Sequence, residues 1–184
     1  MGDDFNNAIA DDLSFGGTSA VAEIDLGASD FNVTPADNLG VFLEQQQIAV
    51  SQEALNTMLL VGLPGDMTSL VLTDDQRRLA NFAKFRIMQG AVRSNLTDSY
   101  LLPAGSDIGL VSPTVASLLF GQNSGYLTIA PNAYDLTFTL PGSKTVVGGP
   151  FRLQLNRSGI YSTVLVDSPS ITMADLIKLD DFAP

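Results

Sequence analysis

The sequence of 184 residues contains no cysteine, no histidine and no tryptophan. Without cysteine the chain can form neither a disulfide framework nor a thiolate metal site. Without histidine it lacks the usual general base near neutral pH and the commonest zinc ligand. A Ser-His-Asp or Cys-His nucleophile is excluded. We therefore expect no catalytic residue, no metal site and no cofactor.

Positive charge is also scarce, because nine Lys and Arg stand against twenty Asp and Glu and give a net charge of −11. Nucleic acids and anionic membranes attract clustered cations, so neither is an expected partner. The chain has no run of 18 apolar residues, and we expect no transmembrane segment. Residues 1–12 are acidic and polar, unlike a signal peptide, and we expect that Met1-Gly2 stands in place of a removed export signal.

What the sequence does contain is a series of short segments in which apolar and polar residues alternate, as in strands with one buried side. Turn residues separate these segments at intervals of roughly ten residues, which favours an all-β sandwich or barrel. Two apolar runs, 58–61 and 161–166, predict more buried strands. The expected strands include 58–61, 83–87, 99–102, 134–140, 151–156 and 161–166.

Evidence for helix is weak. The segment 74–83 (DDQRRLANFA) could form a turn or two of helix, because Asp74 can cap its start. A polar linker that leads into a strand at Ala83 is the preferred interpretation. A short turn is expected at 171–175.

Two long parts of the sequence are similar to each other. Residues 13–62 align without a gap with residues 118–167 at a shift of 105, and 11 of the 50 positions are identical. Apolar positions stay apolar and turns stay in place, which indicates a duplicated β-unit. With one added residue, 70–75 then meets 176–181. The identical positions in the first copy are Leu13, Phe15, Gly16, Ser19, Ile24, Ala28, Asp30, Thr34, Val41, Leu60 and Val61.

The two copies differ in length, since the second begins near Phe82 with strands whose counterparts in the first would precede residue 1. We therefore expect two tandem immunoglobulin-like antiparallel β-sandwich units. Residues 1–78 form the first, which lacks its N-terminal strands, and residues 79–184 form the complete second unit. Because an incomplete sandwich exposes strand edges, we expect the first unit to be completed by a neighbour, by the second unit or by further residues. Homodimerisation or strand exchange would follow.

Several segments resemble the DUF4397 family of bacterial exported proteins. They are FRIMQGA (85–91), the central stretch 118–138 with its Phe-Gly and Ser-Gly-Tyr-Leu motifs, and the late strand 161–166, with 58–62 in the first copy. Gln89 stands where the family usually has histidine. The resemblance implies an immunoglobulin-like sandwich, often in tandem on envelope lipoproteins and secreted proteins. Its motifs are structural and imply no activity.

Phe120-Gly121 and Ser124-Gly125-Tyr126 form the most distinctive local motif. It could be a ligand-binding loop. A tight turn, with glycines at special backbone angles and aromatic rings filling the core, is the preferred interpretation.

Acidic pairs recur at 3–4, 11–12, 74–75 and 180–181. They could bind calcium, but no EF-hand spacing is present, so solvated surface charge or turn capping is expected. Glu23 and Glu44, expected on solvent-facing sides of strands, and Glu53 are weak candidates for a catalytic carboxylate pair.

Other candidates are weaker still. Ser143-Lys144 could form a Ser-Lys nucleophile but reads as a loop dipeptide, and the sequons at Asn32, Asn95 and Asn156 carry little meaning in a bacterial protein. Arg77-Arg78 is expected to pair with the acidic surface at the unit junction.

The chain is therefore expected to be a non-catalytic β-sandwich module that acts as a scaffold, spacer or adhesion surface. Its expected location is the periplasm or the extracellular space, with a lipid anchor in the precursor as an open alternative. The second hypothesis is a module that binds carbohydrate or another small ligand, with or without calcium. A hydrolase ranks third.

Overall fold

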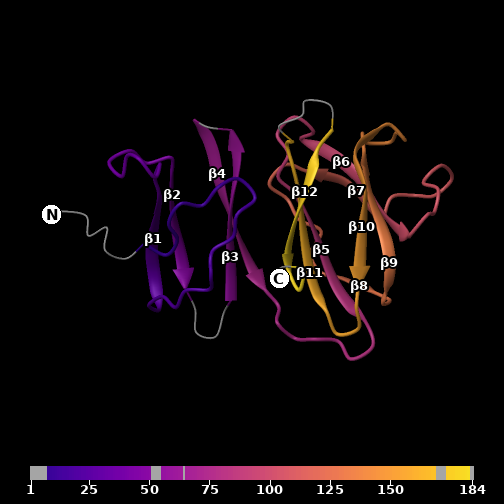
Figure 1. The fold of residues 1–184 in the computed structure, drawn as a ribbon, viewed down its shortest axis with the longest axis horizontal. Coiled ribbons are helices and arrows are strands. Elements are labelled where there is room, and N and C mark those ends of the chain that lie inside the picture. Colours follow the sequence, from indigo (N-terminus) through magenta and orange to yellow (C-terminus); the bar gives the residue numbers. More distant parts are fainter. Residues whose placement is uncertain (1–7, 51–54, 64, 169–172, 183–184) are drawn as a thin grey trace. The chain divides into compact units, whose positions relative to one another are not determined.

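The computed structural model describes residues 8–50, 55–63, 65–168 and 173–182. These residues form twelve β-strands and no helix, which confirms the all-β prediction (Figure 1). The chain divides into two compact units. Unit 1 comprises residues 1–60 and 64–74, and unit 2 comprises residues 61–63 and 75–184.

Unit 1 is built from two hairpin-like strand pairs. Strands β1 (Gly27–Val33) and β2 (Glu44–Val50) pair antiparallel, and β3 (Leu55–Leu63) pairs with β4 (Asp66–Asp74). The hydroxyl of Ser69 on β4 donates to a side-chain oxygen of Glu44 (3.0 Å) or Gln46 (3.1 Å), which links the two pairs. Residues 8–26 form no strand.

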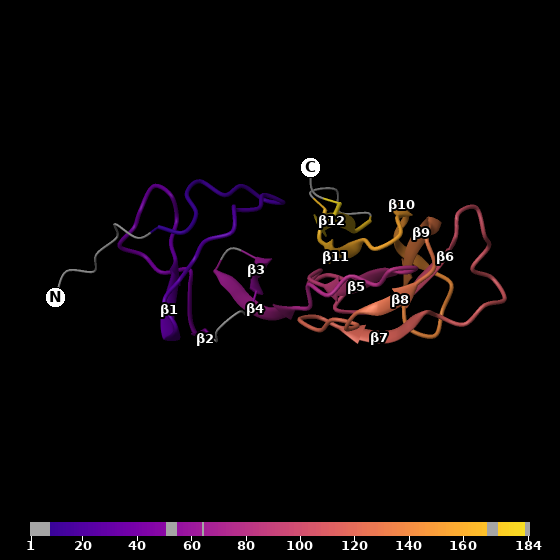
Figure 2. The ribbon, with the colours of Figure 1, turned by 90° about the horizontal axis from the view of Figure 1, so that it is seen from below.

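Unit 2 is a sandwich of two four-stranded sheets, and Figure 2 shows it from a second direction. One sheet has the order β10-β9-β6-β7 and the other has the order β12-β11-β5-β8. The strands are β5 (Ala83–Gln89), β6 (Leu96–Pro103), β7 (Val115–Leu119), β8 (Leu127–Ile129), β9 (Asn132–Thr139), β10 (Val146–Leu155), β11 (Ile160–Val166) and β12 (Asp175–Asp180).

One strand pair in unit 2 is parallel, whereas the sequence predicted antiparallel sheets throughout. Strand β11 runs parallel to β5, with Ile160 opposite Lys84 and Leu165 opposite Gln89. Parallel neighbours need a long crossover, and the chain makes it here through the opposite sheet. The pairs β1–β2, β9–β10, β11–β12, β5–β8, β6–β7 and β6–β9 are antiparallel.

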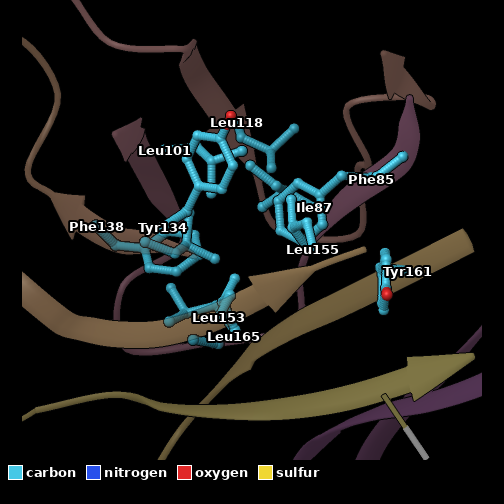
Figure 3. Close-up of a cluster of buried hydrophobic side chains, with 13 residues drawn as sticks. Phe85, Ile87, Leu101, Leu118, Tyr134, Phe138, Leu153, Leu155, Tyr161 and Leu165 are labelled. Atoms are coloured by element: carbon cyan, nitrogen blue, oxygen red, sulfur yellow. The ribbon is translucent and has the colours of Figure 1, made fainter. Parts of the chain in front are cut away.

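The core of unit 2 lies between its sheets, where inward side chains of both layers point toward one another (Figure 3). Phe85 and Ile87 come from β5, and Leu136 and Phe138 come from β9. All four are fully buried, as their alternation predicts. Burial of each such side chain contributes about 1.5–3 kcal/mol.

The alternation also led to wrong expectations. Alternation along 134–140 places Leu140 on the side of Leu136 and Phe138, but Leu140 lies beyond β9 in a turn that its amide closes by donating to Thr145, and its side chain is exposed. The same alternation places Thr137 and Thr139 on the solvent side, yet both are buried because β9 lies between two neighbouring strands. Met58 was placed in a more buried strand but is exposed.

Between the units, residues 75–82 contain no helix, so the preferred linker interpretation of 74–83 is confirmed. Ala83 begins β5 as expected. Part of the turn expected at 171–175 lies outside the described residues, and Asp175 begins β12.

Candidate functional site

The Phe-Gly motif forms a turn that holds β5. Gln122 donates its amide to the carbonyl of Leu119 (2.9 Å), and Gly121 has a φ of 80°, which favours glycine. Gly121 then donates to Gln89 at the end of β5 (2.8 Å), and Gln89 donates back to Gln122 (3.0 Å). The expected tight turn is confirmed, and its bonds fasten a neighbouring strand.

The aromatic rings of this motif do not fill the core, contrary to the prediction. Phe120 and Tyr126 lie outside the buried cluster. The Tyr126 ring instead has two cations over it, with Lys84 Nζ 4.7 Å and Arg86 Cζ 4.6 Å from its centre. Such cation–π contacts are worth about 0.5–2 kcal/mol each, depending on burial.

Both cations on β5 are buried and have further partners. Lys84 Nζ forms an ion pair with Asp75 (2.9 Å) and donates to the carbonyl of Arg77 (3.1 Å), while Arg86 Nε donates to Ser162 Oγ (3.1 Å). Hydrogen bonds from Arg77 and from Lys84 hold the pKa of Asp75 well below its ordinary value. Sequence reasoning missed this cluster, because it expected the alternate residues of β5 to face solvent.

Gln89 is fully buried and organises the loop that follows β5. Its side-chain nitrogen donates to the Ser94 carbonyl and to Thr97 Oγ1 (3.1 Å), and its side-chain oxygen accepts from the Ala91 amide (3.0 Å). This is the position at which the resemblance expects histidine. Here the residue serves to shape a loop.

Asp98 and Asp167 have comparable structural tasks. The carboxylate of Asp98 accepts from the amides of Ser117 (2.7 Å) and Gly142 (2.8 Å), and Asp167 accepts from Val92 (2.8 Å). Each carboxylate therefore satisfies backbone amides of turns that would otherwise lack partners.

The acidic pairs do not gather into a site in the described residues. Asp11 and Asp12 are exposed in coil, and residues 3–4 lie outside the described part. Asp181 accepts from the amide of Ile160 (2.9 Å) and pairs with Arg78, which lowers the pKa of Asp181. Arg77 bonds Asp75 (2.9 Å), so both arginines pair with acids as expected. Asp74 was expected to be solvated, but it is buried, and the hydroxyl of Thr57 bonds its carboxylate (2.6 Å).

Among the residues that the structure describes, no group of three or more acidic residues could hold a metal ion. Glu23 lies in coil, so its expected strand position was wrong. Glu44 is half-buried and accepts from Ser69, so its expected solvent-facing position was wrong too, because β2 turns it toward β4. Glu53 lies outside the described residues.

The Ser143-Lys144 pair shows no nucleophile geometry. Ser143 Oγ bonds Thr145 Oγ1 (3.0 Å), whereas Lys144 Nζ donates to Tyr100 Oη (3.0 Å) and lies 4.2 Å from the centre of the same ring. The sequon asparagines Asn32, Asn95 and Asn156 are all exposed.

The internal sequence similarity has a counterpart in strand pairing. In unit 1, Gly27 pairs with Val50 and Phe31 with Gln46. Adding 105 gives the pairs 132–155 and 136–151, and both occur between β9 and β10. The same shift carries β3 onto β11. Strands of unit 1 thus have defined counterparts in unit 2.

These counterparts differ in their neighbours. In unit 2, β9 also pairs with β6, and β11 also pairs with β5. In the described part of unit 1, β1 pairs with β2 only and β3 with β4 only. The outer edges of β1 and β3 therefore carry backbone groups that the corresponding strands of unit 2 use in sheet bonds. These two edges form the candidate functional site.

Charge is divided unevenly between the units, which composition alone did not reveal. Residues 1–74 contain twelve Asp and Glu and no Lys or Arg. All nine cations of the chain follow Asp75, where only eight acids accompany them from that residue onward. The candidate edges thus belong to the part of the chain that carries all of the excess negative charge.

The chain is an all-β protein whose antiparallel sheets are arranged as in a β-sandwich. A scan against protein-family models finds no match, and a search of the curated proteins finds none either. The resemblance to the DUF4397 family stays a prediction. Among the described residues, no helix has the length and apolar character needed to cross a membrane. Function is therefore inferred from the residues and their geometry.

Proposed function

We propose that the chain is a non-catalytic module of the cell envelope or extracellular space, and that it acts as a scaffold or adhesion surface through its strand edges. The observation that supports this proposal is the pairing difference: β1 and β3 have open edges, while their counterparts β9 and β11 lie inside four-stranded sheets. Open edges are sites at which another chain can add a strand. Tandem immunoglobulin-like units of the DUF4397 type would suit this role.

The polar residues of unit 2 support the non-catalytic part of the proposal. The side chains of Gln89, Asp98 and Asp167 accept hydrogen bonds from backbone amides of loops and turns. Such bonds stabilise a scaffold. A screen with generic esterase, glycosidase and protease substrates should give no turnover above a heat-denatured control, and robust turnover would overturn this part.

Location needs its own test. Fractionation of the native cell, followed by detection with an antibody, should place the chain in the periplasmic, envelope or secreted fraction. Recovery in the cytosolic fraction would contradict the proposed location.

A second candidate function is the binding of a carbohydrate. The exposed side of β1–β2 carries two cross-strand bonds, Gln45 to Asn32 (3.0 Å) and Gln47 to Asp30 (2.9 Å). They border a shallow hollow of about 270 Å³ that is also lined by Phe31 and Gln46. Amide and carboxylate groups along one face of a strand pair can hydrogen-bond sugar hydroxyls. A glycan array, with and without calcium, tests this candidate, and a thermal shift with a hit would support it.

A further inference from the structure

Unit 2 shows what occupies the strand edges that are open in unit 1. Residues 83–103 form an arch in which β5 joins the edge of β11 and β6 joins the edge of β9. This segment contributes Phe85, Ile87 and Leu101 to the core. We call it the β5–β6 arch. The equivalent place in unit 1 lies along β1 and along the 55–60 part of β3.

The backbone of β1 presents bonding groups to this place. In unit 2, Ala104 donates to the carbonyl of Ala133 (3.0 Å), so alternate residues of β9 from 133 onward face β6. Their counterparts in β1 are Ala28, Asp30 and Asn32. The carbonyl of Val33 accepts from Leu43 on the β2 side (2.7 Å), as this alternation requires.

Unit 1 also retains the motif that holds the arch in unit 2. Gly17 donates to the carbonyl of Ser14 (2.8 Å), and Gly16 has a φ of 78°, so the turn at Phe15-Gly16 repeats the turn at Phe120-Gly121. Five of the eleven identities between the copies lie in residues 13–26. Yet Leu13 is 56% exposed, while its counterpart Leu118 is 5% exposed.

The segment 8–26 lacks strands for an identifiable reason. Its counterparts in unit 2 include β7 and β8, which pair with β6 and β5 respectively. Without arch strands beside it, this segment of unit 1 has no sheet to join. The sequence has thus kept turn and strand positions that become useful only when an arch is present.

A second copy of the chain cannot supply the arch without loss. Each copy of these 184 residues has two positions that an arch can occupy, one in each unit, but only one β5–β6 arch. A copy that donated its arch would leave the arch position in its own unit 2 unoccupied. A second copy of this chain is therefore not the proposed donor.

Charge indicates the composition of the donor. Residues 1–74 carry twelve acids and no cation, whereas the arch carries Lys84, Arg86 and Arg93 against Asp98. In unit 2, Arg86 of the arch donates to Ser162. The counterpart of Ser162 in unit 1 is Thr57, whose hydroxyl lies 2.6 Å from Asp74 Oδ2. A cation at this position of a donor would lie near a carboxylate.

We propose, on the basis of the function proposed above, that unit 1 is a strand acceptor. Its partner is a protein that donates an extended, cationic segment with alternating apolar residues, in the pattern of residues 83–103. The donor adds along β1 and β3, and residues 10–14 and 22–24 then form strands against it.

The test uses the full chain and two labelled synthetic probes, peptide 83–103 and peptide 96–103. Fluorescence anisotropy should show saturable binding with one peptide per chain, and for the cationic peptide 83–103 the binding should weaken with added salt. Hydrogen exchange should slow at β1 and in residues 10–24, while exchange in β9 and β10 stays unchanged. The absence of binding, or protection confined to unit 2, would overturn the proposal.

Backbone N-methylation of peptide 96–103 provides the matched control. The amide of Tyr100 faces β9 in unit 2, whereas the amide of Leu101 points away and donates to Thr114 Oγ1 (2.9 Å). N-methylation at Tyr100 should weaken binding about tenfold, because one ladder bond is lost and the methyl group clashes. N-methylation at Leu101 should change it less than about threefold. Equal effects would contradict strand addition.

The chain offers a second pair of variants. Asn32→Pro removes an amide that faces the open edge, where proline is tolerated, while Asn32→Ala keeps this amide and removes the side chain. Only the proline variant should lose peptide binding.

The remaining outcomes separate the two proposals. A dimer of the full chain in light scattering, with β1 protected without peptide, would assign the edge to a second copy and overturn a foreign donor. A native protein that carries its own arch upstream of Met1 would also overturn it. Failed peptide binding with no enzymatic turnover would leave the proposed scaffold function standing, whereas turnover would remove that function whatever the peptide does.

Discussion

At the scale of single residues, unit 2 is held by polar side chains that bond backbone groups in loops. Gln89 is fully buried, and its side chain makes two bonds to backbone groups and one to the hydroxyl of Thr97. A buried amide of this kind stabilises little while satisfied, but its removal leaves several partners unsatisfied. Residues of this type are therefore sensitive points of the scaffold.

Gln89→Leu should destabilise the protein by about 1–3 kcal/mol, because the Ala91 amide and the Ser94 carbonyl lose a buried partner. The free energy of unfolding in urea measures this loss. Gln154→Leu, at an exposed position on β10, serves as the control and should stay within about 0.5 kcal/mol of the parent. Equal effects of the two changes would contradict a structural role for Gln89.

Lowering the pH should destabilise the end of unit 2 that adjoins the linker, because Asp75 loses its charge. Bonds from Arg77 and Lys84 lower the pKa of Asp75, so its stabilising effect is complete above the ordinary carboxyl range and is lost as the pH falls below it. The stability difference between the parent and Asp75→Asn should therefore shrink between pH 6 and about pH 3. Thermal unfolding across this range measures it. A difference that is constant with pH would contradict the ion pair.

At the scale of elements, the same turn has different surroundings in the two units. The Phe120-Gly121 turn bonds the end of β5, whereas the Phe15-Gly16 turn lies in coil. The backbone angle is almost the same in both, with φ values of 80° and 78° at the glycines. The turn is thus specified locally, and its consequence depends on the strand beside it.

Gly121→Val should destabilise unit 2 by about 1–2 kcal/mol, because a β-branched residue is strained at a positive φ. Gly16→Val introduces the same strain in exposed coil, where the chain can relax, so the unfolding of unit 1 should change little. Differential scanning calorimetry of both variants tests this contrast. A larger effect at Gly16 would show that residues 8–26 already pack in the free protein.

Elements that pack along one face were predictable, and those that depend on several neighbours were not. The inward positions Phe85, Ile87, Leu136 and Phe138 followed from alternation, because one face of each strand is apolar. The burial of Lys84 and Arg86 did not, since it depends on Tyr126 from a distant loop. The parallel pairing of β5 with β11 depends on which strands become neighbours, and local pattern does not encode that.

The candidate site was predictable only in outline. The shift of 105 residues leaves the first strands of unit 2 without a counterpart within residues 1–74. Which edges stay open required the strand order, and the retained turn became visible only from its bond and backbone angle. The confinement of every cation to residues after Asp75 could have been read from the sequence.

At the scale of the whole molecule, the two units have unequal cores. Unit 2 buries inward faces of two four-stranded sheets, while most apolar residues of unit 1 are exposed or half-buried. Because buried apolar area is the main source of stability, the units should differ in stability.

Urea should therefore unfold the protein in two steps, with unit 1 first. Hydrogen exchange by mass spectrometry should show fast exchange in β1 to β4 and slow exchange in β9 to β11. Binding of the arch peptide should move the first step to higher urea, because a ligand of the folded state stabilises it. A single transition that both units share would contradict this independence.

The lack of lysine and arginine before Arg77 has a practical consequence. Trypsin cleaves only after these residues, so the first 76 residues contain no bond that it can cut, however exposed their coil. The side chain of Arg77 is 89% exposed and that of Arg78 is 52% exposed, which makes the segment between the units the natural point of attack. Brief digestion would release residues 1–77 as one fragment, which can then be used in affinity purification of binding partners.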